Sequence, residues 1–235
     1  MKKSTTEEIR ERFDHDVARF SDLSTGQAST IDAKISLELI TEASKRISPD
    51  AENLLDIGCG AGNYTIKMLS KLPNLNCTLV DLSQPMLNAA LERVSNHGCN
   101  EVEIVQGDIR EVELKNNHFD IILAGAVLHH LREGEDWHTT FEKLFRLLKP
   151  GGCLMISDLI TQDTATLNEY TWERYGDYLE GLVDKDYRQK VLDYVEKEDS
   201  PRSMNYQLEM MKRVGFSKTE ILHKNMCFGA FGGIK

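Results

Sequence analysis

The sequence has no long apolar run and no excess of positive charge. Its longest apolar stretches, such as residues 119–127, are too short to cross a bilayer, so we expect no membrane segment. Its 28 Lys and Arg residues are outnumbered by 38 Asp and Glu residues, which gives a formal net charge of −10 at pH 7. Because such a surface repels phosphate backbones, we expect no nucleic-acid partner.

Cysteine and proline are also sparse. The five cysteines are an odd number, and no two of them form a C-x-x-C pair, so we expect free thiols, a reducing compartment and no cysteine-ligated metal. The first residues contain no apolar stretch typical of a secretion signal, which adds to the expectation of a cytoplasmic protein. The five Pro are few, the 16 Gly are near average usage, and 40% hydrophobic residues suffice for the core of one domain.

The order of sequence patterns predicts a single α/β domain. Residues 1–50 are charged and helix-favouring, which indicates an N-terminal helical cap that ends at Ser48-Pro49. In the core, residues 51–159, short segments rich in branched residues alternate with amphipathic ones. The expected strands cover residues 53–58, 76–81, 102–107, 119–125 and 153–159, and the expected helices cover residues 62–72, 85–96 and 136–148. This alternation predicts a parallel sheet with helices on both faces.

The last third of the chain divides into two parts. Residues 160–200 are charged, helix-favouring and rich in aromatic residues, so we interpret them as an inserted helical lid. Of the lid aromatics, which include Tyr170, Trp172, Tyr175 and Tyr178, we expect most to pack against the core and one or two to reach a substrate cavity. Residues 201–235 predict a closing helix over 204–214 and two strands over 218–223 and 226–234.

A glycine-rich turn follows the first expected strand. Gly58, Gly60 and Gly62 alternate there, so backbone N–H groups can approach a ligand closely at the edge of the sheet. The third position of the dinucleotide-binding pattern G-x-G-x-x-G is Asn63, and no Gly-Lys-Ser/Thr follows, so NAD and P-loop phosphate sites are disfavoured. The alternative is that the glycines only allow close packing of a strand-to-helix turn.

Acidic residues stand at the ends of the next two expected strands. Asp81 comes 19 positions after Gly62, where a carboxylate can accept hydrogen bonds from both hydroxyls of a ribose. Asp108 follows the third strand and can accept from an adenine amino group, while the N–H of Ile109 can donate to a ring nitrogen. An aspartate at this position is also a common helix cap. Together the strand ends predict a ligand that contains adenosine.

Five segments, in their order along the chain, resemble the motifs of class I S-adenosylmethionine-dependent methyltransferases. They are Asp56-Ile57-Gly58-Cys59-Gly60-Ala61-Gly62, Val80-Asp81-Leu82-Ser83, Met86-Leu87, Gly107-Asp108-Ile109 and Leu147-Leu148-Lys149-Pro150-Gly151-Gly152. The resemblance implies a Rossmann-like seven-stranded, mostly parallel sheet whose last strand is antiparallel, with S-adenosylmethionine as cofactor. It also implies cofactor contacts from Asp56, Gly58, Cys59, Gly60, Asp81, Leu82, Met86, Asp108, Ile109, Ala124 and Gly125.

The segment after the fourth strand carries the candidate catalytic residue. Methyl transfer from a sulfonium depends mainly on alignment in a dry cavity, so a base is optional. His129 and His130 follow Ala124 and Gly125, and we take His129 as the candidate base because an imidazole titrates near neutrality. A structural role for the pair is the alternative. With only His138 nearby and no suitably spaced carboxylate pair, we predict no metal site.

These features predict methyl transfer to a small molecule. The chain lacks the Asn/Asp-Pro-Pro-Tyr/Phe motif of nucleic-acid amino methyltransferases and the Pro-Cys pair of cytosine-C5 enzymes. By resemblance, Phe13 and Phe20 are expected to close over the cofactor from the N-terminal side, although packing alone also accounts for them. A homodimer through the lid or the N-terminal helices is a further expectation.

Two other functions remain open. The segment Lys212-Arg213-Val214-Gly215-Phe216 resembles the tail of carboxy-S-adenosylmethionine synthases. In those enzymes an arginine on the helix before the Gly-Phe turn holds the extra carboxylate of the cofactor, whereas this chain has Met210 there, with Arg202 and Arg213 nearby. The other alternative is a non-catalytic, S-adenosylmethionine-binding regulatory partner.

Overall fold

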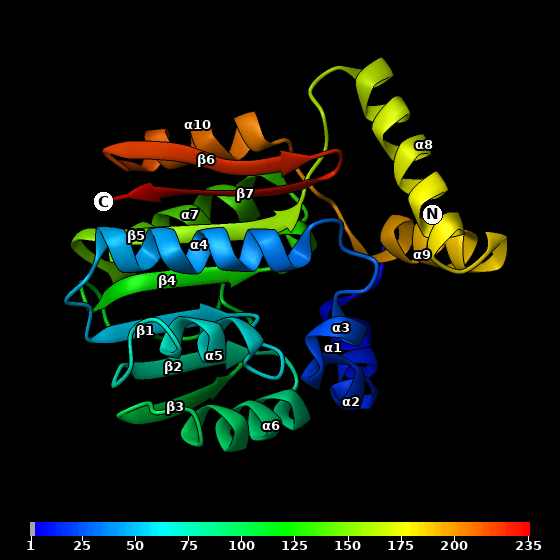
Figure 1. The fold of residues 1–235 in the computed structure, drawn as a ribbon. Coiled ribbons are helices and arrows are strands. Elements are labelled where there is room, and N and C mark those ends of the chain that lie inside the picture. Colours follow the sequence, from blue (N-terminus) through cyan, green and yellow to red (C-terminus); the bar gives the residue numbers. More distant parts are fainter. Residues whose placement is uncertain (1–2) are drawn as a thin grey trace.

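Seven strands form one sheet in the order β3-β2-β1-β4-β5-β7-β6 (Figure 1). The computed structural model describes residues 3–235, except the side chains of residues 23 and 24. The strands are β1 Asn53–Ile57, β2 Asn76–Asp81, β3 Glu101–Gln106, β4 Phe119–Gly125, β5 Leu148–Leu159, β6 Lys218–Asn225 and β7 Phe228–Ile234. Only β7 runs antiparallel to its neighbours. The predicted fold class, with its antiparallel last strand, is confirmed.

Helices cover both faces of the sheet. They are α1 Thr6–His15, α2 Val17–Ser21, α3 Leu23–Gly26, α4 Ala33–Ile47, α5 Asn63–Leu69, α6 Gln84–Ser95, α7 Gly134–Leu147, α8 Ala165–Leu182, α9 Lys185–Glu198 and α10 Met204–Val214, with a short 3-10 helix η1 at Leu128–His130. Successive strand residues point to opposite faces, so Leu54 packs with α4, α5 and α6 while Leu55 packs with α7 and α10. Coverage of both faces by helices explains why every residue of β1 is buried, including the polar Asn53 and Asp56.

β5 begins earlier than the sequence predicts. The expected strand covers residues 153–159, after a Pro-Gly-Gly segment that usually ends an element, but the strand already starts at Leu148. The ladder with β4 contains an irregularity that pairs Phe119 with Leu148 and then Ile121 with Cys153. Gly151, at φ +82°, lies in this irregularity, and its N–H donates to the carbonyl of Lys235. The Pro-Gly-Gly segment is therefore accommodated inside the strand.

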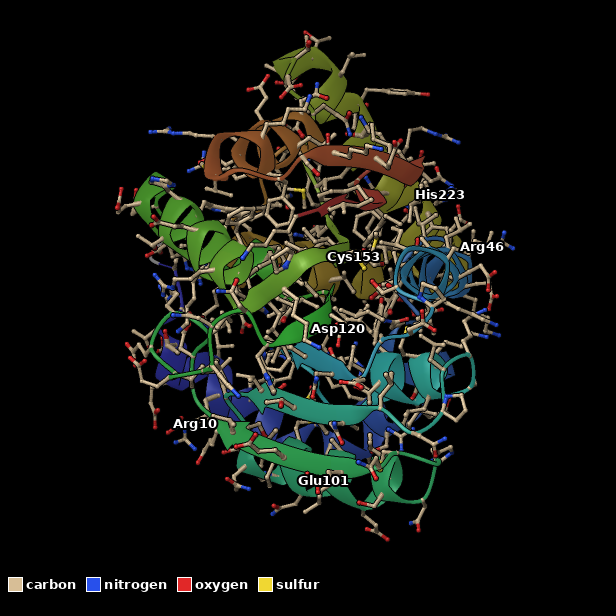
Figure 2. The ribbon with its side chains drawn as sticks, turned by 90° about the vertical axis from the view of Figure 1, so that its left-hand side faces the viewer. Arg10, Arg46, Glu101, Asp120, Cys153 and His223 are labelled. Atoms are coloured by element: carbon tan, nitrogen blue, oxygen red, sulfur yellow. The ribbon has the colours of Figure 1, made fainter. Side chains whose placement is uncertain are left out.

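The amino ends and the carboxyl ends of the parallel strands have different surroundings. At the edge in front in Figure 2, Asp120 accepts hydrogen bonds from the backbone N–H groups of Glu52 and Asn53 and from Lys149 Nζ, at 2.9–3.0 Å. Beyond the opposite edge lie α1–α3 and the α8–α9 pair (Figure 1). The carboxyl ends of the parallel strands point toward these helices, so a ligand there can be enclosed.

The α8–α9 pair packs on the sheet through its own apolar cluster. Tyr175 is 2% exposed and meets the ring of Phe228 edge to face at 5.3 Å. Trp172, Tyr178 and residues of α9 pack around it. Tyr170 is instead 57% exposed. No helix within residues 3–235 combines the length and apolar character needed to cross a membrane.

Candidate active site

The glycine turn after β1 contains two glycines with different surroundings. Gly58 and Gly60 both adopt positive φ, at +60° and +50°, which L side chains rarely adopt. A Cβ at Gly58 would lie 2.4 Å from Cγ2 of Val127, whereas a Cβ at Gly60 would have no described atom within 4 Å. Gly58 is therefore required for packing, and Gly60 borders open space into which a ligand fits.

Asp81, at the end of β2, faces this turn. Its Oδ2 accepts a hydrogen bond from the N–H of Gly60 at 2.8 Å, and its Oδ1 accepts from the N–H of Ser83 at 2.9 Å. Burial raises the pKa of the Asp81 carboxyl, and these backbone hydrogen bonds partly offset that rise. Two strand ends that the sequence singled out separately are thus joined by the hydrogen bond between Gly60 and Asp81.

Asp56 has a different environment from the one implied by the resemblance. It is 1% exposed, and its Oδ2 accepts a hydrogen bond from the hydroxyl of Thr65 in α5 at 2.6 Å. Burial raises the pKa of Asp56 to about 7. Asp56 therefore joins β1 to α5 from inside the core and fixes the turn between them.

Asp108 is already bound by a residue that sequence reasoning missed. Arg110 donates from its backbone N–H at 2.9 Å and from Nε at 3.0 Å to Oδ1 of Asp108, and its Nη2 contacts Oδ2. Burial alone would raise the pKa of Asp108, but the bonds to Arg110 outweigh it and lower that pKa. The only feature of the sequence that could have predicted this pair is that Arg110 follows Asp108 by two positions. Ile109, beside it, is buried.

The remaining predicted cofactor residues line the same edge. Cys59 and Met86 are buried, and Leu82 is half-buried, with its carbonyl accepting from Gln106. Ala124 is fully buried at the end of β4. A Cβ at Gly125 would lie 2.6 Å from Cε2 of Tyr64, so this glycine gives room to the Tyr64 ring. The sequence interpretation assigned that room to the cofactor.

His129 lies between two carboxylates. Its Nδ1 contacts Oδ1 of Asp158 on β5, its backbone N–H donates to Oδ2 of Asp158 at 3.2 Å, and its Nε2 is 3.7 Å from Oδ1 of Asp199. Burial alone would lower the pKa of His129, but the two negative charges outweigh it and raise that pKa to about 9. Burial and the neighbouring His129 lower the pKa of His130.

The expectation that no suitably spaced carboxylate pair accompanies the histidines is therefore wrong. Asp158 lies 29 positions after His129 and is brought back by the pairing of β4 with β5. Asp199 directly follows α9 and arrives by the folding of the lid. Asp158 lies near the end of an expected strand, as Asp81 does, so the sequence could have predicted it. No local feature of the sequence indicates Asp199.

A cleft of about 320 Å³ lies under the lid, next to the histidines. Its lining includes Trp172, Leu192, Val195, Pro201, Lys3 and Asp199. The lining is mostly apolar, with charged groups at one end, which is typical of small-molecule sites. Among the lid aromatics, Trp172 is the one that lines this cleft.

The N-terminal cap is fixed to the lid beside the same cleft. Arg12 in α1 donates from Nε and Nη2 to the carboxylate of Glu198 at 2.7–3.1 Å, and from Nη2 to the hydroxyl of Tyr194 at 2.6 Å. The ring of Phe13 lies 6.2 Å from that of His130 and 5.4 Å from that of Phe20. The cap thus packs against the lid and the ring of His130.

Comparisons with known proteins agree with this geometry. Residues 54–152 match the model of the methyltransferase domain family. Carboxy-S-adenosyl-L-methionine synthase of Vibrio atlanticus is 27% identical over 188 residues, which cover 78% of this chain and 76% of the relative. Demethylmenaquinone methyltransferase of Listeria welshimeri is 28% identical over 173 residues, which cover 70% of each chain.

A solved structure places a cofactor product in a related fold. It is phosphoethanolamine N-methyltransferase 2 of Haemonchus contortus in complex with phosphomonomethylethanolamine and S-adenosylhomocysteine. It is 25% identical, with a TM-score of 0.55, and the match covers 80% of this chain and 38% of that one. The open space at Gly60 and the partly exposed Asp81 leave room for such a molecule at the ends of β1 and β2. The fold and these comparisons together support an S-adenosylmethionine-dependent methyltransferase with S-adenosylmethionine as its cofactor.

Proposed function

We propose that the protein transfers a methyl group from S-adenosylmethionine to a small, largely apolar acceptor that enters through the cleft under the lid. The observation that carries this proposal is the position of the cleft. It ends at Asp199, 3.7 Å from Nε2 of His129, and His129 follows the strand next to the glycine turn. An acceptor in the cleft therefore faces the strand ends at which Asp81 and Gly60 meet.

Each predicted site residue has a role in this proposal. The turn with Gly58, Cys59 and Gly60 surrounds the methionine part, and Asp81 accepts from the ribose hydroxyls. Leu82, Met86, Asp108 and Ile109 surround the adenine, Ala124 and Gly125 form the floor at the end of β4, and Asp56 positions the turn from the core. His129 contacts the acceptor.

Alignment and exclusion of water supply most of the rate in this proposal. The bound cofactor supplies an electrophilic methyl group on a sulfonium leaving group. The α8–α9 pair and the N-terminal cap exclude water from the strand ends, and well-oriented reactants can gain up to about 7–11 kcal/mol from alignment. His129 orients the nucleophilic atom of the acceptor, because Asp158 holds its ring in one orientation.

The test is the formation of S-adenosylhomocysteine. The purified protein is incubated with S-adenosylmethionine and a panel of small apolar hydroxyl, amine and thiol compounds, and the product is quantified by mass spectrometry. We expect product with at least one acceptor class and none without acceptor. Saturable cofactor binding with no turnover across the panel would contradict the proposal and favour a regulatory partner.

A second candidate is a carboxy-S-adenosylmethionine synthase, because one relative carries that name. The helix before the Gly-Phe turn, α10, presents the buried Met210 toward the sheet, whereas Lys212 and Arg213 are exposed. Arg202 instead stacks on the ring of Tyr206 at 5.4 Å. Mass spectrometry of the ligand that co-purifies separates the candidates, since a carboxylated sulfonium would support the synthase and an unmodified cofactor supports methyl transfer.

A further inference from the structure

Three side-chain atoms that bind metals in other proteins converge beside the cleft. Nε2 of His129 and Nδ1 of His130 lie 3.7 Å and 3.3 Å from Oδ1 of Asp199, and all three atoms lie within 4.8 Å of one another. Ligands of a tetrahedral zinc ion, bound at about 2.0–2.1 Å, are roughly 3.3 Å apart. One ion can therefore reach all three atoms after small side-chain shifts.

Two of these atoms are buried without a hydrogen bond. Nδ1 of His130 and Oδ1 of Asp199 have no hydrogen-bond partner among the described residues, although they face each other. Nε2 of His129 is also too far from Asp199 for a hydrogen bond. Buried polar atoms without partners are rare in folded proteins, and each one calls for an explanation. A cation between them would satisfy all three.

Asp158 orients His129 for such an ion. Oδ1 of Asp158 accepts from Nδ1 of His129, which leaves the lone pair on Nε2 directed toward Asp199. The backbone N–H of Leu159 donates to the same oxygen at 2.7 Å, so the carboxylate is itself held in place. A carboxylate that accepts from the second ring nitrogen is the usual support of a metal-bound histidine.

The charges near the site fit a dication. An ion that binds Nε2 displaces the proton that the raised pKa places on His129, so in the bound state both imidazoles are neutral and Asp158 and Asp199 contribute two negative charges. The nearby cations donate to other oxygen atoms than the Asp199 carboxylate, because Arg132 donates to the hydroxyl of Ser200 and Lys3 donates to the backbone carbonyls of Glu196 and Asp199. The cleft ends at Asp199 and so gives an ion a way in.

We propose that His129, His130 and Asp199 bind one divalent transition-metal ion of the zinc class, with Asp158 as a positioning residue. Two imidazoles and one carboxylate are a frequent ligand set for such ions, and three protein ligands leave a coordination position open. This inference replaces the sequence-based prediction of no metal site. Binding of the ion does not depend on the proposed methyl transfer. Its use as a Lewis acid toward an acceptor oxygen in the cleft, in place of the direct contact between His129 and the acceptor, does rest on that function.

The test uses the full-length protein, stripped with a chelator and dialysed against zinc. Elemental mass spectrometry of the protein should then find one zinc per chain. Asp199→Ala and His130→Ala should each weaken zinc binding more than about 100-fold, and Asp158→Asn about 10- to 100-fold. The matched control is His97→Asn, which removes an exposed histidine just after α6 and should leave the affinity unchanged.

Cobalt gives a readout that does not depend on the variants folding. Wild-type protein loaded with cobalt(II) should develop visible absorption bands that one equivalent of zinc removes. Wild-type protein without saturable zinc or cobalt binding overturns the inference, as does zinc binding lost equally in His97→Asn. Failure of zinc binding with normal formation of S-adenosylhomocysteine refutes the metal site alone. Zinc binding without any turnover refutes the methyl transfer alone.

Discussion

Gly58 and Gly60 are two positions apart. An added side chain would clash with a neighbour at Gly58 but would enter open space at Gly60. Both require positive φ, but only Gly58 faces a packed neighbour, Val127. The sequence analysis could identify the turn from its glycines but could not distinguish packing from ligand access. That distinction depends on which residues of β4 and the following loop come close, and these lie far along the chain.

Alanine substitutions separate the two roles. Gly60→Ala should lower the free energy of unfolding by about 1–2 kcal/mol, the cost of the left-handed conformation, and weaken cofactor binding at least about tenfold by filling ligand space. Gly58→Ala should cost about 3 kcal/mol or more, because it adds a clash. The matched control is Gly98→Ala, which has φ +77° and an open Cβ site away from the turn. Chemical denaturation and calorimetry measure both effects, and equal affinity losses in Gly60→Ala and Gly98→Ala would contradict the role of Gly60.

Asp56 predicts a measurable dependence of stability on pH. Its folded-state pKa of about 7 lies above the unfolded value of 3.8, so the folded state binds more protons between these values. The contribution of Asp56 to the free energy of unfolding is fully present below pH 4 and is lost as pH rises through 7. Asp56→Asn keeps an acceptor for Thr65 and cannot ionise. The variant should match wild type below about pH 4 and exceed its free energy of unfolding by up to about 4 kcal/mol at pH 8.

Urea denaturation across this pH range measures the difference. Asp50→Asn, an exposed substitution, should leave the pH profile unchanged. A constant difference between Asp56→Asn and wild type from pH 5 to pH 8 would show that Asp56 does not titrate as described.

At the scale of elements, local signals set many boundaries correctly. α10 occupies the predicted residues, because Ser203 caps its first turn and Gly215 ends it at φ +115°. β2 and β4 also match, since their branched residues are flanked by polar ones. β5 was predicted too short, because its irregular pairing with β4 is a tertiary feature that no local pattern records. The contact between Arg12 in α1 and Glu198 in α9 could likewise not be predicted from the sequence, because these residues are 186 positions apart.

The Arg12–Glu198 pair joins the N-terminal cap to the lid, so its loss should loosen the lid. Arg12→Met leaves the carboxylate of Glu198, 6% exposed, without its partner. Because Arg12 is partly exposed, we expect a loss of about 1–3 kcal/mol in the free energy of unfolding, together with faster hydrogen exchange in α9. The double variant Arg12→Met/Glu198→Gln should recover part of this loss. Unchanged exchange in α9 of Arg12→Met would show that the pair does not hold the lid.

At the scale of the whole molecule, sheet topology explains why the site could be predicted in part. Carboxyl ends of neighbouring parallel strands share one edge, so Gly60 and Asp81 had to meet whatever the details of packing. The groups that enclose the acceptor come instead from the lid and the N-terminal cap. Their places depend on long-range contacts such as that of Asp199 with the histidines. The meeting of the strand ends could therefore be predicted from the sequence, whereas the arrangement of the lid and the N-terminal cap around them could not.

The central claim is that the end of β2 binds the ribose of the cofactor through Asp81. Calorimetric titration of S-adenosylhomocysteine into the wild-type protein and Asp81→Ala tests it most directly, with Glu101→Ala, exposed at the opposite edge of the sheet (Figure 2), as control. The account predicts saturable binding of one molecule per chain, weakened about 10- to 100-fold in Asp81→Ala and unchanged in Glu101→Ala. Wild-type affinity in a folded Asp81→Ala protein, or no saturable binding at all, would contradict it.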